Sequence, residues 1–165
     1  MSVSLLPEEI VNLARRVVDE NRAIGRRVAL AESCTGGLVA AAITEIPGSS
    51  AVLDRSFVTY SNEAKKETLG VAGDVIDAFG AVSIACVYAM AQGALEHSDA
   101  DVAVAISGIA GPDGGSEQKP VGTVVFARAK RYAEDREAES KLFEAEDRSE
   151  VRRQATLCAL ELLLP

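Results

Sequence analysis

Two adjacent nucleophilic side chains, Ser33 and Cys34, begin the segment SCTGG at residues 33–37 of this 165-residue chain. Either could attack a carbonyl carbon if a neighbouring group removed its proton. The thiol of Cys34 is the stronger nucleophile, but it needs a histidine or another cation to lower its pKa. The one histidine, His97, is predicted at the far end of a helix. Cys34 is therefore expected to be a packed small residue, and Ser33 is the candidate nucleophile.

A serine nucleophile also needs a base, and a desolvated, neutral lysine can serve. Lys65 and Lys66 lie in the segment YSNEAKK at residues 60–66. Two adjacent amines disfavour each other's protonated forms, which helps one of them to be neutral. The alternative for both lysines is a solvated position on a polar helix. For Tyr60, at the end of the preceding strand, the alternative is a half-buried core position.

The SCTGG segment follows the short apolar run 28–31 and precedes a helical run of small residues at 38–46. Such a strand-to-helix turn presents backbone N–H groups to a ligand, and Gly36 and Gly37 would let the ligand approach closely. Together with Thr35, the turn is predicted to hold a phosphate or to stabilise an oxyanion. The alternative is an ordinary turn capped by serine or threonine.

A second glycine-rich segment, SGIAGPDGG at residues 107–115, follows the apolar run 102–106. Four glycines and a proline in nine residues exceed what a short connection needs. A ligand-binding loop is therefore favoured over a mobile hairpin connection. Ligands of α/β sheets bind beyond the carboxyl ends of the strands. Both glycine-rich segments are expected at one edge of the sheet, provided that their strands are parallel.

Arg148 lies in the first turn of the last predicted helix, three residues before the apolar stripe that begins at Val151. A cation at the start of a helix opposes the helix dipole, which indicates an anionic partner. An exposed ion pair with a carboxylate is the alternative. The preceding residue, Asp147, is predicted to cap this helix.

Apolar runs and helical spacings alternate along the chain, so an α/β layered fold is expected, in one domain spanning residues 1–165. Strands are predicted at 28–31, 52–60, 102–106 and 121–127, with an edge strand at 141–145. Helices are predicted at 7–24, 38–46, 61–69, 83–95 and 147–162. The charged segment 128–140 is interpreted as a solvated hairpin turn or strand edge.

The composition argues against several classes of protein. The net charge is −8, aromatic residues make up 4% and there is no tryptophan, which argues against a nucleic-acid-binding surface. No apolar run is long enough to span a membrane, and the start MSVSLLPEEI is unlike a signal peptide. Three widely spaced cysteines and one histidine argue against disulfides and a structural zinc site. We expect a cytoplasmic location, no cofactor or metal, and no nucleic-acid or membrane partner.

Five motifs, in order along the chain, resemble those of the CinA C-terminal domain family. They are AESCTGGL at 31–38, YSNEAK at 60–65, GAVS at 80–83, SGIAGP at 107–112 and KPVGT at 119–123. Each motif alone is modest, and together they are highly specific. The resemblance implies a three-layer α/β/α sandwich with a mixed, mostly parallel sheet. It also implies a nicotinamide-nucleotide amidohydrolase, which converts nicotinamide mononucleotide and water to nicotinate mononucleotide and ammonia.

The resemblance also implies roles for the candidate residues. Ser33 would be the nucleophile, Lys65 its base, and Tyr60 would line the site. Backbone N–H groups from Thr35 to Gly37 would hold the oxyanion of the reaction.

The phosphate of the substrate is expected to bind at the other glycine-rich loop. This loop begins with Ser107, where many relatives have threonine, and continues with Gly108. Arg148 corresponds to the arginine of the family's Gly-Asp-Arg segment. The glycine of that segment is Glu146 here, so the local turn is expected to differ.

Two other functions stay open at this point: a nucleotide-binding module without catalysis, and a competence or DNA-damage-associated protein. The presence of both Ser33 and Lys65 favours the enzyme, and the net charge of −8 counts against direct DNA contact. Many relatives carry a larger N-terminal domain that this sequence does not include, so the activity of that domain is not expected. A homo-oligomer is expected, and the apolar helix at 38–46 could serve as its interface.

Overall fold

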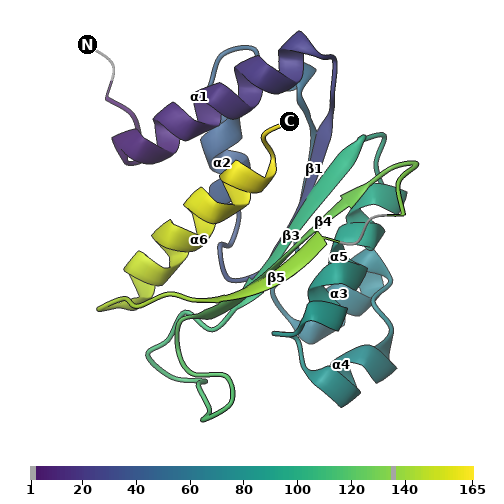
Figure 1. Cartoon of the computed structure of the whole chain (residues 1–165), viewed down its shortest axis with the longest axis vertical. Coiled ribbons are helices and arrows are strands. Elements are labelled where there is room, and N and C mark those ends of the chain that lie inside the picture. Colours follow the sequence, from purple (N-terminus) through teal and green to yellow (C-terminus); the bar gives the residue numbers. More distant parts are fainter. Residues whose placement is uncertain (1–2, 135–136) are drawn as a thin grey trace.

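The computed structural model describes residues 3–134 and 137–165 (Figure 1). The elements, in chain order, are α1 (Glu8–Ala23), β1 (Val28–Glu32), α2 (Leu38–Thr44), the 3₁₀ turn η1 (Ser49–Ala51), β2 (Leu53–Val58), α3 (Asn62–Leu69), α4 (Gly73–Phe79), α5 (Ile84–Glu96), β3 (Val102–Gly108), β4 (Thr123–Lys130), β5 (Glu137–Leu142) and α6 (Arg148–Leu162). The strands form a five-stranded sheet in the order β2-β1-β3-β4-β5. β1 is parallel to β2 and β3, whereas β4 is antiparallel to β3 and β5. All strands of this sheet except β4 therefore point the same way, which confirms the mixed, mostly parallel sheet.

Helices cover both faces of this sheet (Figure 1). α1, α2 and α6 lie on one face, and α3, α4 and α5 lie on the other. Each face has its own cluster of buried apolar side chains. The predicted three-layer α/β/α sandwich is confirmed.

The two central strands, β1 and β3, present larger side chains to the helices on one face of the sheet than to those on the other. In β1, Val28 and Leu30 point into the cluster under α1, α2 and α6, whereas Ala29 and Ala31 point toward α5. The same alternation of branched residues and alanine runs through residues 102–106 of β3. Consecutive strand residues face opposite sides of a sheet, so the alanines leave room for α5 to lie close to it.

α5 also lies close to α3, and Gly93 allows this contact. A Cβ atom at Gly93 would lie 2.1 Å from the carbonyl oxygen of Leu69, at the end of α3. No larger residue fits there without moving one of the two helices. Because α3 carries Lys65, this contact helps to position a candidate catalytic side chain.

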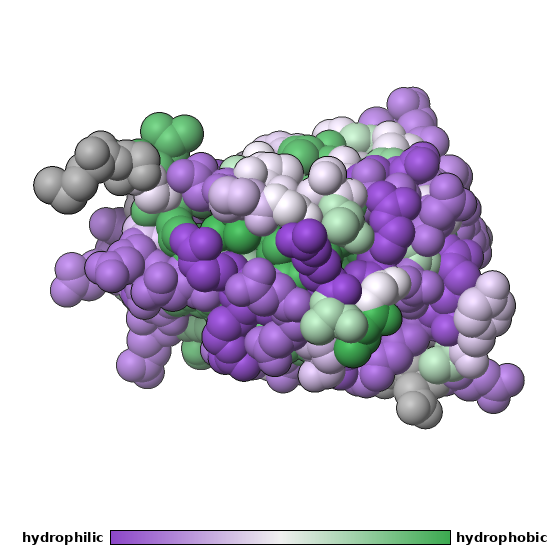
Figure 2. Space-filling view, turned by 90° about the horizontal axis from the view of Figure 1, so that it is seen from above, coloured by the Kyte–Doolittle hydropathy of each residue, from purple (hydrophilic) through white to green (hydrophobic). Residues whose placement is uncertain are grey.

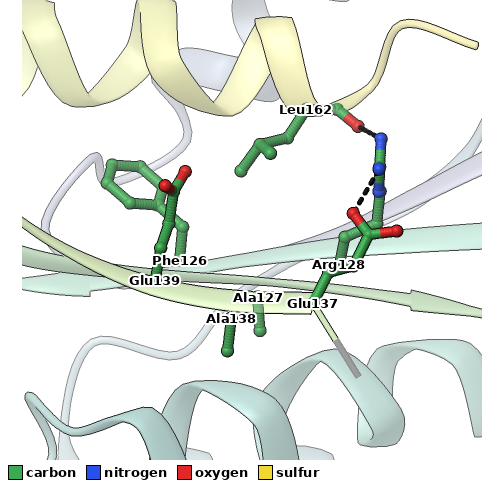
Figure 3. Close-up of a pocket in the computed structure, with 7 residues that line it drawn as sticks. All are labelled: Phe126, Ala127, Arg128, Glu137, Ala138, Glu139 and Leu162. Atoms are coloured by element: carbon green, nitrogen blue, oxygen red, sulfur yellow. Dashed lines mark hydrogen bonds and ion pairs between the residues drawn. The ribbon is translucent and has the colours of Figure 1, made fainter. Parts of the chain in front are cut away.

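The C-terminal end of α6 is held by donors from other elements. Beside a cavity of about 290 Å³ between α6 and β5, Arg128 donates from Nη1 to the carbonyl oxygen of Leu162 at 3.0 Å (Figure 3). Asn21 and Arg26 both donate to the carbonyl oxygen of Leu163. These donors satisfy carbonyl groups that a helix end leaves without intrahelical partners. They fix the helix whose other end reaches the candidate site.

The edge strand differs from its prediction. β5 spans Glu137–Leu142, so the predicted range 141–145 was correct only for its first two residues. The segment 128–140, interpreted as a solvated hairpin turn or strand edge, includes the end of β4 up to Lys130 and the edge strand β5 from Glu137. β5 pairs with β4 alone, and Ala138 is its one side chain packed on an apolar cluster, so its sequence lacks apolar alternation. Residues 135–136 of this segment lie outside the described residues.

α4 was not predicted from the sequence. The apolar side of α2 is used inside the chain, where Val39, Ala42 and Ile43 are buried in the core. The apolar character of this helix therefore has an explanation that needs no second subunit.

The surface in Figure 2 is mostly hydrophilic, with apolar residues in small areas between the polar ones. Within residues 3–134 and 137–165, no helix is both long enough and apolar enough to cross a membrane. Cys34, Cys86 and Cys158 are free and buried.

Candidate active site

A cavity of about 300 Å³ lies at the carboxyl ends of β1 and β3. The turn after β1, the start of α3, the loop after β3 and the first residue of α6 all contribute to its wall. The lining residues include Ser33, Cys34, Tyr60, Asn62, Lys65, Ala81, Val82, Ser107, Gly108, Gly111, Asp113 and Arg148. The two glycine-rich segments thus meet at one edge of the sheet, as their positions after adjacent parallel strands predict.

Ser33 and Lys65 contact each other at the floor of this cavity. The Nζ atom of Lys65 lies 3.0 Å from the Oγ atom of Ser33. It lies 2.9 Å from the carbonyl oxygen of Thr59 and 3.0 Å from that of Tyr60. Lys65 is only 1% exposed and Ser33 only 7%. The structure therefore brings together the two groups that the sequence analysis paired.

The surroundings of Lys65 favour the neutral amine. Burial lowers the pKa of Lys65 below its ordinary value, and the thiols of Cys86 and Cys34 oppose this shift only in part. No carboxylate pairs with Lys65 among the described residues. A neutral amine has two N–H donors and one lone pair. Two carbonyl oxygens can accept the two N–H groups, which leaves the lone pair to accept the hydroxyl proton of Ser33.

Local sequence explains how α3 holds Lys65 in place. The hydroxyl of Ser61 accepts the N–H of Ala64 and caps the helix at its start. Gly70 ends the helix in the left-handed region with φ 71°. β2 ends just before this helix, so the carbonyls of residues 59 and 60 point at the Lys65 amine rather than into the sheet.

The turn at residues 33–37 is arranged differently from the prediction. The carboxylate of Glu32 accepts the N–H groups of Val39 and Ala40 at the start of α2, at 3.0 and 3.1 Å. Within the turn, Gly36 donates its N–H to the carbonyl oxygen of Ser33. Glu32 therefore occupies two of the N–H groups at this helix start, and an anion site formed by the N–H groups of Thr35 to Gly37 stays a prediction.

Thr35, Gly36 and Gly37 are correspondingly not among the residues that line the cavity. Thr35 is fully buried and donates from its hydroxyl to Glu32 at 2.7 Å. Gly36 and Gly37 take φ values of 58° and 102°, which glycine adopts at little cost. These three residues shape the turn, and their predicted contact with substrate finds no support in this geometry.

Arg148 lies at the mouth of the cavity. It donates to the carbonyl oxygen of Gly111 at 2.7 Å and to the hydroxyl of Tyr60 at 3.0 Å. Asp147 caps α6 as predicted, accepting the N–H of Glu150. Arg148 reaches the cavity although Glu146 stands where the family motif has glycine.

Ser107 lies deeper in the same cavity and is only 1% exposed. Gly108 lies beside it, and a Cβ atom there would lie 2.7 Å from a methyl group of Val124 and 3.1 Å from the sulfur of Cys34. Glycine is therefore required for the loop to pass over Cys34.

Cys34 and His97 play no part as a nucleophile and base pair. Burial raises the pKa of Cys34 to about 11, so its thiol is protonated near neutral pH. His97 bonds through Nδ1 to the carbonyl oxygen of Gly93 within α5 and stacks edge-on with Phe57. The expectation that Cys34 is a packed small residue is confirmed.

Sequence analysis missed Glu32 and Arg152. Arg152 donates to the carbonyl oxygens of Cys34 and Thr35, at 3.0 and 3.3 Å. Two signals in the sequence point to these residues. A glutamate at the end of a fully buried strand needs internal donors, and Arg152 follows Arg148 by four residues, which places both on one side of α6.

Comparison with known proteins gives the family. The model of the CinA C-terminal domain matches residues 10–165. The chain belongs to the CinA C-terminal domain family. The resemblance inferred from five motifs is thereby confirmed.

Relatives in the CinA family fall into two groups by length. A nicotinamide-nucleotide amidohydrolase of Escherichia coli K12 is 53% identical over 158 residues, which cover 94% of this chain and 93% of that protein. A CinA-like protein of Shewanella loihica is 46% identical over 160 residues, but they are only 37% of its length. Among solved structures, a competence/damage inducible protein of Agrobacterium tumefaciens superposes with a TM-score of 0.94 at 48% identity, covering 98% of this chain and 97% of that one.

Proposed function

We propose that this CinA-family protein is a nicotinamide-nucleotide amidohydrolase that converts nicotinamide mononucleotide and water to nicotinate mononucleotide and ammonia. The observation that carries the proposal is the 3.0 Å contact between Ser33 Oγ and Lys65 Nζ in a cavity of about 300 Å³. The name of the 53% identical relative supports the choice of substrate. The charged pyridinium ring of that substrate withdraws electrons and makes its carboxamide carbon easier to attack.

The first half of the reaction forms a covalent intermediate. Neutral Lys65 takes the hydroxyl proton of Ser33, and the serine oxygen attacks the carboxamide carbon. The lysine then gives this proton to the departing amine, so ammonia leaves as the C–N bond breaks. The product of this half-reaction is an ester between the nicotinoyl group and Ser33.

The second half restores the enzyme with water. Lys65, neutral again, takes a proton from a water molecule that attacks the ester. The tetrahedral intermediate collapses, the proton returns to Ser33, and nicotinate mononucleotide is released. The same residue serves as base and acid in both halves, as microscopic reversibility requires.

Donors for the oxyanion come from residues that line the cavity. Since Thr35, Gly36 and Gly37 are not among the residues that line the cavity, we assign the oxyanion to the N–H of Cys34 and the hydroxyl of Ser107. The residue after the nucleophile commonly supplies such an N–H group in serine hydrolases. Each well-aimed donor contributes roughly a hundredfold or more to the rate.

The phosphate is assigned to the mouth of the cavity. Arg148 donates there to two neutral acceptors, the carbonyl oxygen of Gly111 and the hydroxyl of Tyr60, so no carboxylate neutralises its positive charge through these bonds. The charge is available to an anion. Its two donors are spaced to bind a phosphate bidentately. Tyr60 and the loop that begins at Ser107 would hold the nucleoside between this arginine and Ser33.

Ammonia release from nicotinamide mononucleotide tests the proposal, with free nicotinamide as the comparison substrate. Wild type and the control Ser50→Ala, an exposed serine that is not among the cavity-lining residues, should release ammonia at equal rates. Ser33→Ala should lose activity, and hydroxylamine should trap the nicotinoyl group as a hydroxamate only when Ser33 is present. Full ammonia release by Ser33→Ala would refute the proposal. Binding of the nucleotide by wild type without turnover would instead identify a non-catalytic binding module.

A further inference from the structure

The turn that carries Ser33 is bonded on both sides by charged groups that do not face the cavity. β1 ends at Glu32, and consecutive strand residues point to opposite faces of a sheet. Ser33 therefore points toward α3 and Lys65, whereas Glu32 points toward α2. Glu32 is fully buried and is not among the cavity-lining residues.

Glu32 accepts four hydrogen bonds, and each oxygen has two donors. Oε1 accepts from the hydroxyl of Thr35 and the N–H of Val39, and Oε2 accepts from the N–H of Ala40 and the hydroxyl of Ser56. No Lys or Arg pairs with this carboxylate among the described residues. Because the carboxylate is buried, losing any of these four neutral donors would leave one of its oxygens without a partner in an apolar core. The carboxylate therefore fixes the positions of its donors.

Arg152 bonds to the other polar groups of the same turn. Its guanidinium donates to the carbonyl oxygens of Cys34 and Thr35, the two residues directly after the nucleophile. Ser33 itself donates its N–H to Ile106 of β3 at 3.0 Å. The turn is therefore attached to β3, to α2 through Glu32 and to α6 through Arg152.

We propose that Glu32 and Arg152 are positioning residues for Ser33. Glu32 holds the Thr35 side chain and the first turn of α2, and Arg152 holds the carbonyl groups of residues 34 and 35. Together they prevent the turn from rotating Ser33 Oγ away from Lys65 Nζ. Neither residue touches the substrate, so its loss lowers kcat and leaves KM nearly unchanged. This inference rests on the proposed role of Ser33 as nucleophile.

Thr35 provides the sharpest test, because two substitutions distinguish the hydrogen bond of its hydroxyl to Glu32 from the packing of its side chain. Thr35→Val keeps the shape and removes the hydroxyl, whereas Thr35→Ser keeps the hydroxyl. With nicotinamide mononucleotide, Thr35→Val should lower kcat about tenfold to a hundredfold, the scale of a displacement of about 1 Å at a reacting atom. KM should stay within about twofold, and Thr35→Ser should retain most of the wild-type kcat.

Variants of the charged residues extend the test. Glu32→Gln keeps one acceptor oxygen and turns the other into a donor, and it should lower kcat in the same way. Arg152→Gln should also lower kcat, whereas Arg153→Gln is the matched control, because Arg153 pairs with Glu150 and Glu9 away from the turn. Should Glu32→Gln not fold, the Thr35 pair still decides the question.

Amide hydrogen exchange of residues 33–40 adds a measurement that needs no substrate. Exchange there should be faster in Thr35→Val than in Thr35→Ser, with the rest of the chain unchanged. A rise in KM with unchanged kcat would overturn the proposal and make Thr35 a substrate contact. Unchanged kcat and unchanged exchange would also overturn it. If wild type released no ammonia, the proposed function would fail, and the exchange data alone would decide whether Glu32 and Arg152 hold the turn.

Discussion

Replacing Lys65 by methionine removes the amine while keeping a flexible side chain of similar length. In the proposed reaction this substitution removes the general base, whose contribution is typically 10²–10⁴-fold. We therefore expect kcat/KM for nicotinamide mononucleotide to fall by about that factor, which corresponds to about 2.7–5.4 kcal/mol of transition-state stabilisation. Lys66→Met is the control, since Lys66 is paired with Glu63 on the outer side of the same helix.

The same substitution should leave the protein folded. It deprives the carbonyls of Thr59 and Tyr60 of a donor, and an unsatisfied buried acceptor costs about 1–3 kcal/mol. It also removes an amine that burial makes unfavourable in its charged form, so the two effects oppose each other. Urea unfolding of wild type and variant measures the net change, which we expect to be below about 3 kcal/mol.

The pH dependence gives the second part of this prediction. Because the pKa of Lys65 is lower in the folded protein than its ordinary value of 10.5, the unfolded chain binds more protons between these two values. Stability contributed by this residue is therefore complete above pH 10.5 and is lost as the pH falls through the lowered pKa. Wild-type stability should rise with pH across this window more steeply than that of Lys65→Met. The kcat/KM of wild type should rise as Lys65 loses its proton, with a midpoint below 10.5.

Two results would refute the reasoning. A folded Lys65→Met that keeps more than about a tenth of the wild-type kcat/KM would show that the amine is not the base. Equal losses in Lys65→Met and Lys66→Met would show that position on α3, and not the contact with Ser33, causes the effect.

Three further predictions concern other residues. Cys34→Ala should retain most of the activity. Iodoacetamide should leave the wild type active near neutral pH, because the pKa of the Cys34 thiol is about 11. Ammonia release measures both activities, and mass spectrometry shows whether Cys34 is alkylated. Gly93→Ala should lower the free energy of unfolding by about 1–3 kcal/mol in urea titrations, since its Cβ would lie 2.1 Å from the Leu69 carbonyl oxygen, and the resulting shift of α3 should also reduce kcat. Arg148→Met should raise KM for nicotinamide mononucleotide about tenfold to a hundredfold, the size of a charge-assisted contact, and should change KM for nicotinamide riboside, which lacks the phosphate, far less. Equal changes for both substrates would place the phosphate elsewhere.

Much of the fold follows from local patterns in the sequence. The apolar runs at 28–31 and 102–106 predicted the two central strands, and an aspartate cap at 147 predicted the start of the last helix. The strand at 137–142 could not be found in this way, because it packs on one side only and buries little more than Ala138. Where burial is slight, charge dominates the sequence and hides the strand.

The position of the two serines of the site was predictable from the order of the strands. Ser33 directly follows β1 and Ser107 lies at the end of the adjacent parallel strand β3, so topology alone brings them to one edge of the sheet. The contacts of Arg152 with the turn were not predicted, because Arg152 and Cys34 are 118 residues apart and no local spacing records their bond. The binding role expected for Thr35 stays a prediction, and its hydroxyl donates to the neighbouring Glu32.

The last helix completes a site whose nucleophile lies more than a hundred residues earlier. Its far end is tied to Asn21, Arg26 and Arg128, and its near end supplies Arg148 and Arg152. During synthesis, a nascent chain of which only residues 1–147 have left the ribosome tunnel already exposes Ser33 and Lys65, whereas Arg148 and Arg152 are still inside the tunnel. Such a chain should release ammonia much more slowly than the chain that includes α6, and assays on stalled and released ribosome complexes can measure the difference. A polypeptide truncated before α6 lacks both arginines, so we expect it to have little activity toward nicotinamide mononucleotide.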